Sequence, residues 1–489
     1  MEDKGFQSRS EGGTAAGQRR LKRQVTGRDH RWFAAVQHPF VPVTFGELVS
    51  LGAREAEESA EGIRFTASFP EIYGFHLSVK TVSRFWLIVD DFSVRSREEL
   101  FRKTFRIPWE LYLRPGLPIR TRAMVRRSAV RHEGETAETV SEAILKKLEA
   151  SGVTRVVSSG ADSSGAAEGG TGDTRAISGD ETQAVGGVEI QAVSGVEIQA
   201  VEAVVIDNRC ELRLDSTGEH LHKRGYRAHT EPAPVRETTA AAILLWAIGK
   251  IGMPALFLDP MCGSGTFPVE MWGLSRKVSL VTGRRFRFMD WPGFKERTWA
   301  FLVRKSGEER RVLSGQTPAG QGDQPGGVGR CPACPVIRGS DVSAKAIRSA
   351  RANAASLGLE GDILLETGDF FRLSGEEISG SAAAGNDFGG ETAIWCGDEA
   401  ASGGEKNVRL LCLNPPYGKR LPVTAGRNPY EAIISHCRER FRGWRILMLV
   451  PREEKPAGLE TRYDVESVPF TNGGIPLFAL LLADKKPGR

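Results

Sequence analysis

The rest of the chain is arranged around the sequence LFLDPMCGSGT, Leu256–Thr266. Its short apolar beginning is typical of a strand buried in a parallel sheet. The strand ends at Asp259, and the glycines that follow can adopt positive φ or let the backbone approach a ligand closely. The apolar residues of 267–274 then predict a helix. A strand, a glycine turn and a helix in this order form a nucleotide-type pocket at the carboxyl end of a strand.

The glycine turn differs from the two best-known phosphate-binding loops. No Gly-Lys-Ser/Thr closes it as in a Walker loop, and its glycines do not complete a G-x-G-x-x-G pattern. Taken alone, the stretch is equally compatible with a structural tight turn. The other motifs of the sequence are needed to distinguish a ligand-binding turn from a structural one.

Later apolar stretches also end in polar residues. The stretch 336–339 ends in Ser340-Asp341 and is followed by a strong helical pattern at Ala344–Ala355. Strands are also predicted at 363–367, 408–413, 446–450 and 477–482. Because parallel strands place their carboxyl ends at one edge of a sheet, one crevice can collect several of these polar ends. The expected set is Asp259, Asp341, Asp369 and Asn414.

The Asn-Pro-Pro-Tyr sequence at 414–417 predicts a site for an amine on a planar base. Pro415 and Pro416 remove two backbone donors and stiffen the turn. Asn414 Oδ1 and the Pro415 carbonyl can then accept the two hydrogens of an exocyclic amine, while Tyr417 stacks on the base. The alternative is a proline-rich turn with Asn as a cap, which the series of strand ends disfavours.

Such an amine would attack a methyl sulfonium, so the cofactor expected is S-adenosyl-L-methionine. Its amino-acid end would lie by the glycine turn, its ribose hydroxyls on Asp341 and its adenine amine on Asp369. Nearby Lys and Arg side chains would hold RNA phosphates. The residues expected to contact the cofactor are Asp259, Met261, Cys262, Gly263, Gly265, Thr266, Asp341, Asp369 and Phe370.

Composition places few limits on this interpretation. The chain has 489 residues, 40% of them hydrophobic, and a formal charge of +5, which permits an anionic partner without requiring one. Seven scattered cysteines indicate reduced thiols, and the single C-x-x-C at 331–334 has no second pair to complete a zinc site, so we expect no metal. No apolar stretch approaches the length of a membrane span, and no signal peptide is evident, so we expect a cytoplasmic protein.

The remaining composition predicts the domain organisation. Residues 1–31 are polar with a basic cluster and predict a disordered arm. Residues 32–230 predict an α+β RNA-binding region, interrupted by a low-complexity insertion at 152–199. Residues 231–489 predict the catalytic domain, with Gly-rich insertions at 307–329 and 374–406.

Four motifs carry a family resemblance: DPMCGSGT at 259–266, SD at 340–341, GD at 368–369 and NPPYGKRL at 414–421. They resemble the THUMP-domain class I RNA methyltransferases, most closely the bacterial enzymes that methylate guanine N2 in large-subunit ribosomal RNA. TVSRFWL at 81–87, PWE at 108–110 and LHKRGYR at 221–227 look like the amino-terminal region of that family and its junction with the catalytic domain.

The resemblance implies a ferredoxin-like and THUMP module followed by an α/β Rossmann-like domain with a mixed, mostly parallel seven-stranded sheet. It implies contact of Asn414, Pro415 and Tyr417 with the target amine. It also favours RNA contact over bare solvated surface for a set of basic residues. These are Lys80, Arg84, Arg122, Arg126 and Arg127.

We therefore predict a methyltransferase acting on guanine N2, with 23S ribosomal RNA as the favoured substrate. Within the same chemistry, tRNA guanine-N2 methylation and adenine-N6 methylation of a nucleic acid remain open, because N-P-P-Y recognises an amine without specifying the ring. A non-catalytic RNA-binding assembly factor is the alternative from another class. The oligomeric state is not predicted.

Overall fold

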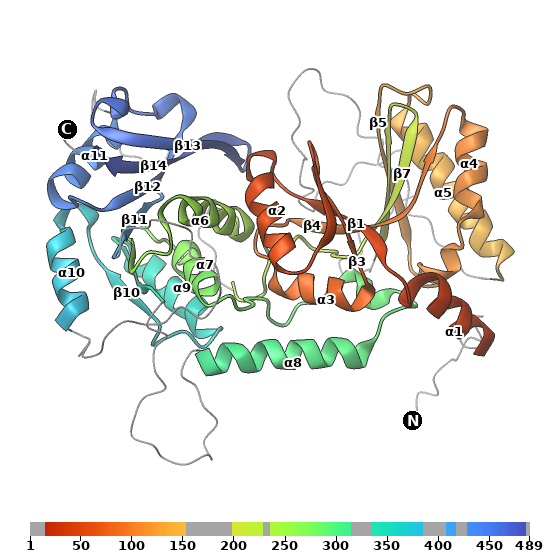
Figure 1. Ribbon diagram of the computed structural model, residues 1–489, viewed down its shortest axis with the longest axis horizontal. Coiled ribbons are helices and arrows are strands. Elements are labelled where there is room, and N and C mark those ends of the chain that lie inside the picture. Colours follow the sequence, from red (N-terminus) through yellow and green to blue (C-terminus); the bar gives the residue numbers. More distant parts are fainter. Residues whose placement is uncertain are drawn as a thin grey trace, which may run out of the picture. The chain divides into compact units, whose positions relative to one another are not determined.

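A computed structural model describes residues 15–152, 198–227, 235–313, 334–384, 407–416 and 428–485. The chain divides into two compact units (Figure 1). Residues 1–32, 86–218 and 287–294 form the first unit, and residues 33–85, 219–286 and 295–489 form the second.

The carboxyl-terminal sheet lies in the second unit and has the strand order β10-β9-β8-β11-β12-β14-β13. The first five strands in this order are parallel, and β14 is antiparallel to both of its neighbours. The expected mixed, mostly parallel seven-stranded sheet is thereby confirmed. Its strands are β8 (Leu256–Asp259), β9 (Val336–Asp341), β10 (Ile363–Thr367), β11 (Arg409–Leu413), β12 (Arg445–Pro451), β13 (Tyr463–Asn472) and β14 (Ile475–Asp484).

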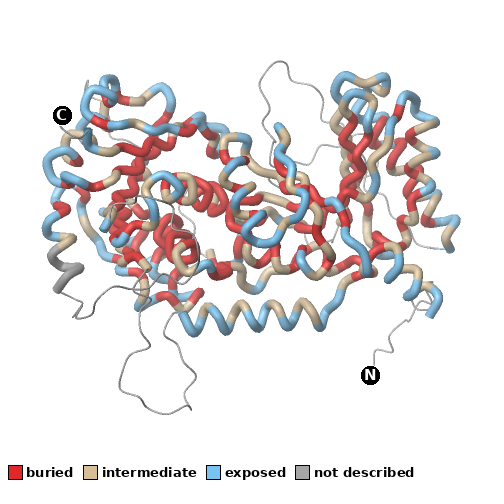
Figure 2. The backbone as a smooth tube through the Cα atoms, in the orientation of Figure 1, coloured by how far each residue is buried: buried red, intermediate tan, exposed pale blue. Residues whose placement is uncertain are grey.

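Helices cover both faces of this sheet, because successive strand residues point to opposite sides. Phe257 joins an apolar cluster with α6, α7 and α9, whereas Leu256 and Leu258 join a second cluster with α10 and α11. Figure 2 shows the central strands buried between these helices. The helices are α6 (Glu237–Ile251), α7 (Thr266–Ser275), α9 (Ala344–Ala355), α10 (Gly375–Ala384) and α11 (Pro429–Arg440), and the second unit also contains α8 (Glu296–Leu313).

The amino-terminal half of the chain forms a second seven-stranded sheet with the order β2-β3-β1-β4-β7-β6-β5. Strands β5 and β6 pair in parallel, and β6 forms an antiparallel hairpin with β7. The strands are β1 (His30–Ala35), β2 (Arg54–Ser59), β3 (Gly62–Ala67), β4 (Arg84–Ser93), β5 (Ile119–Arg126), β6 (Gln199–Ile206) and β7 (Arg209–Asp215), and the helices are α1 (Ala15–Leu21), α2 (Val41–Ser50), α3 (Phe69–Ser78), α4 (Arg97–Arg106) and α5 (Glu133–Ala150).

The disordered arm expected over residues 1–31 is wrong for its described part. Residues 15–21 form α1, residues 22–26 continue as a π-helical turn, and β1 begins at His30. The segment is held by the rest of the described chain: Val25 is buried, and Arg20 Nη2 lies 2.9 Å from Glu110 Oε1. A basic sequence therefore forms ordered helix here because it contributes one apolar side chain and finds an acidic partner.

The expected insertions lie largely outside the described residues, and their bounds need correction. Gln199 is a fully buried member of β6, and its side-chain oxygen accepts a hydrogen bond from Arg114 N at 2.7 Å. Gly307 belongs to α8, which continues to Leu313, and α10 occupies Gly375–Ala384.

Residues 33–85 belong to the second unit, a division that differs from the expected boundary at 230. Gln37 Nε2 donates to Thr471 O at 3.0 Å, and Lys295 N donates to the Tyr73 hydroxyl at 3.2 Å. The ring centroids of Phe40 and Phe470 are 6.1 Å apart. Such contacts tie the chain's first strands and helices to its last strands.

Candidate functional site

Four polar strand ends lie along one edge of the carboxyl-terminal sheet. In the parallel registers Asp259 is opposite Gly339 and Thr367 is opposite Asp341, so β8, β9 and β10 end at the same level. Strand β11 is the other neighbour of β8 and ends one residue before Asn414. The structure thus brings Asp259, Asp341, Asp369 and Asn414 to adjacent positions of one edge.

The glycine turn after β8 depends on two residues with positive φ. Gly263 has φ +55° and Gly265 has φ +86°, a region that favours glycine. A Cβ at Gly265 would also lie 3.1 Å from Ala350 Cβ of α9, closer than nearly all real contacts. Helix α7 begins at Thr266, so its free backbone N–H groups lie directly after the turn.

Asp341 has a role in the protein that its sequence position did not indicate. Its Oδ2 accepts from Gly263 N at 3.0 Å and its Oδ1 accepts from Ser343 N at 2.8 Å. Cys262 N also donates to Ser340 O at 2.9 Å. The tip of β9 therefore holds the glycine turn in place, while lone pairs on the Asp341 carboxylate stay available for a ligand.

Asp259 and Asn414 each present a buried acceptor oxygen that has no hydrogen-bond partner among the described residues. These atoms are Asp259 Oδ2 and Asn414 Oδ1. The other Asp259 oxygen accepts from Met261 N at 3.1 Å. Burial raises the pKa of Asp259 well above its ordinary range, the Met261 N–H opposes the shift, and the Asp341 charge adds to it. Since buried polar atoms are nearly always paired, both oxygens suit donors from a bound ligand.

Asp369 lies at the exposed end of this edge. Its Oδ1 accepts from Phe371 N at 3.0 Å, which caps a short 3-10 turn, and its side chain is 45% exposed. The carboxylate is therefore accessible to a ligand amine.

The role expected for Phe370 is contradicted by its burial. Phe370 is 3% exposed, and its ring packs against His436 and Phe441 at centroid distances of 4.7 Å and 5.9 Å. The exposed apolar side chains at these strand ends are Phe371, at 50%, and Val342, at 76%. Sequence reasoning did not select Phe371 or Val342, although each directly follows a residue that it did select. An apolar residue next to a selected strand end is the signal that could have identified them.

The remaining expected cofactor residues are placed around the turn. Cys262 is buried, and its thiol lies 3.8 Å from Gly263 O, so it packs inside the turn. Met261 is partly buried against the cluster formed by α10 and α11. In the amine turn Asn414 is half-buried, Pro415 is buried and Pro416 is exposed, whereas Tyr417 lies outside the described residues.

Of the expected RNA contacts, the structure contradicts Lys80. This lysine is 5% exposed, and its Nζ donates to Val278 O at 2.7 Å. Burial lowers the pKa of Lys80 to about 8, Arg224 adds to the shift, and Glu47 and Glu270 oppose it. Its ammonium group is committed to protein carbonyls and cannot reach a phosphate.

The other expected RNA contacts lie nearer the surface. Arg84 and Arg122 are half-buried, and Arg126 is exposed. Arg127 is also exposed, and its guanidinium forms two hydrogen bonds of 2.8 Å with Asp207. An RNA phosphate at Arg127 would therefore compete with this carboxylate.

Within the described ranges, no helix has both the length and the apolar character needed to cross a membrane. The same ranges contain no group of three His, Cys, Asp or Glu side chains arranged to bind a metal ion.

Residues 224–389 match the family model described as RMKL-like, methyltransferase domain. This segment contains the glycine turn and the polar ends of β8, β9 and β10.

Two curated relatives match most of the chain. The chain is 27% identical over 430 residues to the ribosomal RNA large subunit methyltransferase K/L of Syntrophotalea carbinolica, covering 87% of this chain and 49% of the relative. It is 26% identical to the putative RNA methyltransferase slr0064 of Synechocystis sp., covering 91% of this chain and 94% of the relative. The chain thus spans about half the length of the first relative and nearly all of the second.

The fold is shared with a solved structure. The putative methyltransferase SMU.472, crystallised with SAH, aligns with a TM-score of 0.63 over 94% of this chain and all of that chain, at 22% identity. At this identity the comparison supports the fold, a class I methyltransferase sheet.

Proposed function

We propose that the chain, whose residues 224–389 match the family model described as RMKL-like, methyltransferase domain, is an S-adenosyl-L-methionine-dependent RNA methyltransferase. Its substrate is the exocyclic N2 amine of a guanine in 23S ribosomal RNA, and it acts in the cytoplasm. The observation that carries this proposal is a pair of buried acceptors at the ends of neighbouring strands, Asp259 Oδ2 and Asn414 Oδ1, which have no hydrogen-bond partner among the residues that the structure describes. One acceptor suits the ammonium group of the cofactor, and the other suits the amine to be methylated.

The residues of the glycine turn fit the cofactor. When bound, S-adenosyl-L-methionine supplies a methyl group on a positively charged sulfonium. Asp259 accepts hydrogen bonds from its ammonium, Asp341 accepts from its ribose hydroxyls, and Asp369 accepts from its adenine amine. Gly263 and Gly265 keep the turn free of side chains where the backbone meets the ligand. Val342 and Phe371 supply exposed apolar surface for the adenine faces.

The amine turn orients the nucleophile. Asn414 Oδ1 and the Pro415 carbonyl accept the two N–H groups of guanine N2, which directs the nitrogen lone pair toward the methyl group. No strong base is required, because the product ammonium is acidic and loses its proton to water. Correct orientation of two reacting groups can contribute roughly 7–11 kcal/mol to lowering a barrier.

The test is methyl transfer to defined RNA. Purified protein is incubated with methyl-labelled cofactor and total RNA from cells that lack the protein, and the labelled nucleosides are identified by mass spectrometry. We expect N2-methylguanosine in 23S RNA. Label in tRNA would identify the tRNA enzyme instead, label on adenine N6 would replace the guanine assignment, and RNA binding without transfer would favour an assembly factor.

A further inference from the structure

Ser264 lies at the centre of the glycine turn and is held by side chains on two sides. Arg227 Nη2 donates to Ser264 Oγ at 2.8 Å, and Asn353 Nδ2 of α9 donates to Ser264 O at 3.1 Å. Ser264 is 4% exposed and stands between Gly263 and Gly265, both with positive φ. Glycines restrict the backbone little, so these side-chain bonds add to the β9 contacts that hold the turn in place.

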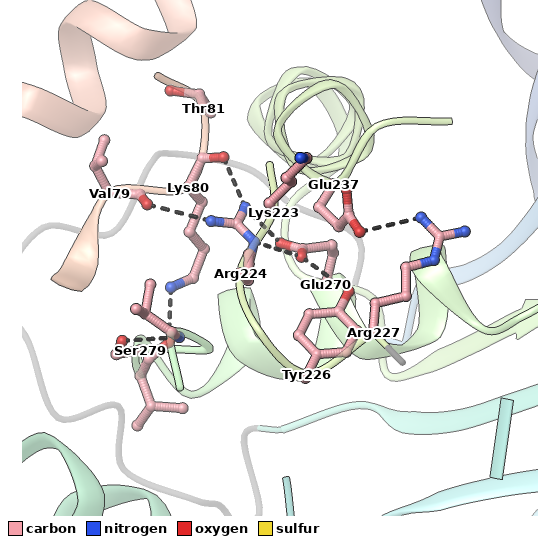
Figure 3. A network of polar contacts seen from close by, with 12 residues as sticks. Val79, Lys80, Thr81, Lys223, Arg224, Tyr226, Arg227, Glu237, Glu270 and Ser279 are labelled. Atoms are coloured by element: carbon pink, nitrogen blue, oxygen red, sulfur yellow. Dashed lines mark hydrogen bonds and ion pairs between the residues drawn. The ribbon is translucent and has the colours of Figure 1, made fainter. Parts of the chain in front are cut away.

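Arg227 is itself fixed by an acidic partner. Its Nη1 lies 3.0 Å from Glu237 Oε1 in the first turn of α6, and the two side chains are only 9% and 5% exposed. Figure 3 shows Arg227 directed toward Glu237. The carboxylate compensates the buried charge, and the second guanidinium nitrogen is left to hold Ser264.

Arg224, three residues earlier, fixes the helix that follows the turn. Its Nε and Nη2 lie 2.8 Å and 3.0 Å from the two carboxylate oxygens of Glu270 in α7, and the side chains are 2% and 0% exposed. Arg224 Nη2 also donates to Lys80 O at 2.8 Å. The contacts of Arg224 lie in the second unit, and Figure 3 shows them beside the Arg227–Glu237 pair.

Segment 224–227 therefore contacts both the glycine turn, through Ser264, and α7, through Glu270. We infer that Arg227 is a positioning residue of the cofactor site. It does not contact the cofactor but holds Ser264 so that the turn keeps its binding shape. The inference rests on the cofactor named in the proposed function and is independent of which RNA or base is methylated.

Calorimetric affinity for S-adenosylhomocysteine, the demethylated product of the cofactor, tests this role without any RNA. Arg227→Gln removes the guanidinium and should weaken binding about tenfold, and Ser264→Ala should weaken it by a similar factor. The double variant should bind no more weakly than Arg227→Gln alone, because Arg227→Gln already breaks the contact that Ser264→Ala removes. Arg227→Lys keeps a charge that can reach Glu237 and should recover part of the affinity.

Arg276→Gln provides the matched control. Arg276 follows the carboxyl end of α7, is 7% exposed and lies 3.5 Å from Asp362 Oδ1, so its loss should lower the melting temperature and leave the affinity unchanged. In methyl transfer, Arg227→Gln should raise KM for the cofactor and change kcat little.

Several outcomes would overturn the inference. The positioning role would be excluded if Arg227→Gln bound S-adenosylhomocysteine with wild-type affinity. It would also be excluded if the losses of affinity multiplied in the double variant, or if Arg276→Gln lost as much affinity as Arg227→Gln. If the wild-type protein binds no S-adenosylhomocysteine, the cofactor assigned in the proposed function is refuted. Measurements on the variants alone could not give that result.

Discussion

At the scale of single residues, Asn414 is the group whose loss should separate chemistry from binding. Its Oδ1 is a buried acceptor without a partner in the described part of the chain. Asn414→Ala should lower methyl transfer by about two orders of magnitude, a loss seen when one positioned hydrogen-bonding group is removed from an active site. Affinities for RNA and for S-adenosylhomocysteine should stay near wild type. A variant with normal transfer would exclude Asn414 as the amine acceptor.

Two neighbouring phenylalanines should respond to truncation in opposite ways. Phe370→Ala opens a cavity among buried rings and should cost about 3–5 kcal/mol of unfolding free energy. Phe371→Ala removes an exposed ring, so it should leave stability nearly unchanged and weaken S-adenosylhomocysteine binding by about fivefold, the low end of base stacking on an aromatic ring. Urea unfolding and calorimetry measure the two effects. Unchanged affinity in Phe371→Ala would remove its assignment to the adenine face.

At the scale of elements, the glycine turn can be tested through Gly265. An alanine there would take φ +86° and meet Ala350 Cβ at 3.1 Å, whereas Gly283, with φ +58°, has open space around its Cβ position. Gly283→Ala should therefore show backbone strain alone, roughly 1–2 kcal/mol. Gly265→Ala should lower the free energy of unfolding by more than Gly283→Ala does, and it should also weaken cofactor binding. Equal costs in the two variants, with affinity intact, would contradict a turn shaped for a ligand.

Strong periodic patterns allowed several elements to be predicted from sequence. The helix expected at Ala344–Ala355 and the strand expected at Ile363–Thr367 have these bounds in the structure. A helical apolar period and a short apolar stretch with a polar end are local signals. These local signals were enough to predict α9 and β10, because each element buries the apolar face that its own sequence indicates.

Sequence patterns did not predict α3, α5 or β13. Helix α3 is apolar on nearly every side and is buried through Phe69, Ile72, Tyr73 and Phe75, so it lacks a clear amphipathic period. Lys80 was misassigned for a related reason. A lysine is normally exposed, and the Val278 carbonyl that accepts a hydrogen bond from its buried ammonium is far away in sequence.

At the scale of the whole molecule, acid should destabilise the fold through His76. Its ring is fully buried in α3, with Nδ1 2.8 Å from Ile72 O and the rings of Phe85 and Phe286 each at 4.9 Å. Burial lowers the pKa of His76 to about 3, the Ile72 carbonyl opposes the shift, and Arg284 adds to it. The unfolded chain, with a pKa near 6.5, therefore binds the proton more tightly than the folded protein does.

The sign of the pH effect follows from that difference. Stability from neutral His76 is fully present above about pH 6.5 and is lost as the pH falls toward 3, at about 1.4 kcal/mol per unit. Urea unfolding at pH 7.5 and 5 should show a larger loss for wild type than for His76→Phe. His132→Gln, at an exposed position, should keep the wild-type dependence. Equal pH dependence in wild type and His76→Phe would exclude His76 as the acid-sensitive group.

The contacts of residues 33–85 limit how the protein can be cut and recombined. Phe40 lies against Phe470 of β13, and Lys80 Nζ donates a hydrogen bond to Val278 O. If another methyltransferase domain were joined to this amino-terminal region at residue 230, each of these contacts would lose one of its two residues. A working hybrid would have to inherit residues 33–85 together with the catalytic sheet and exchange only the segments of the first unit.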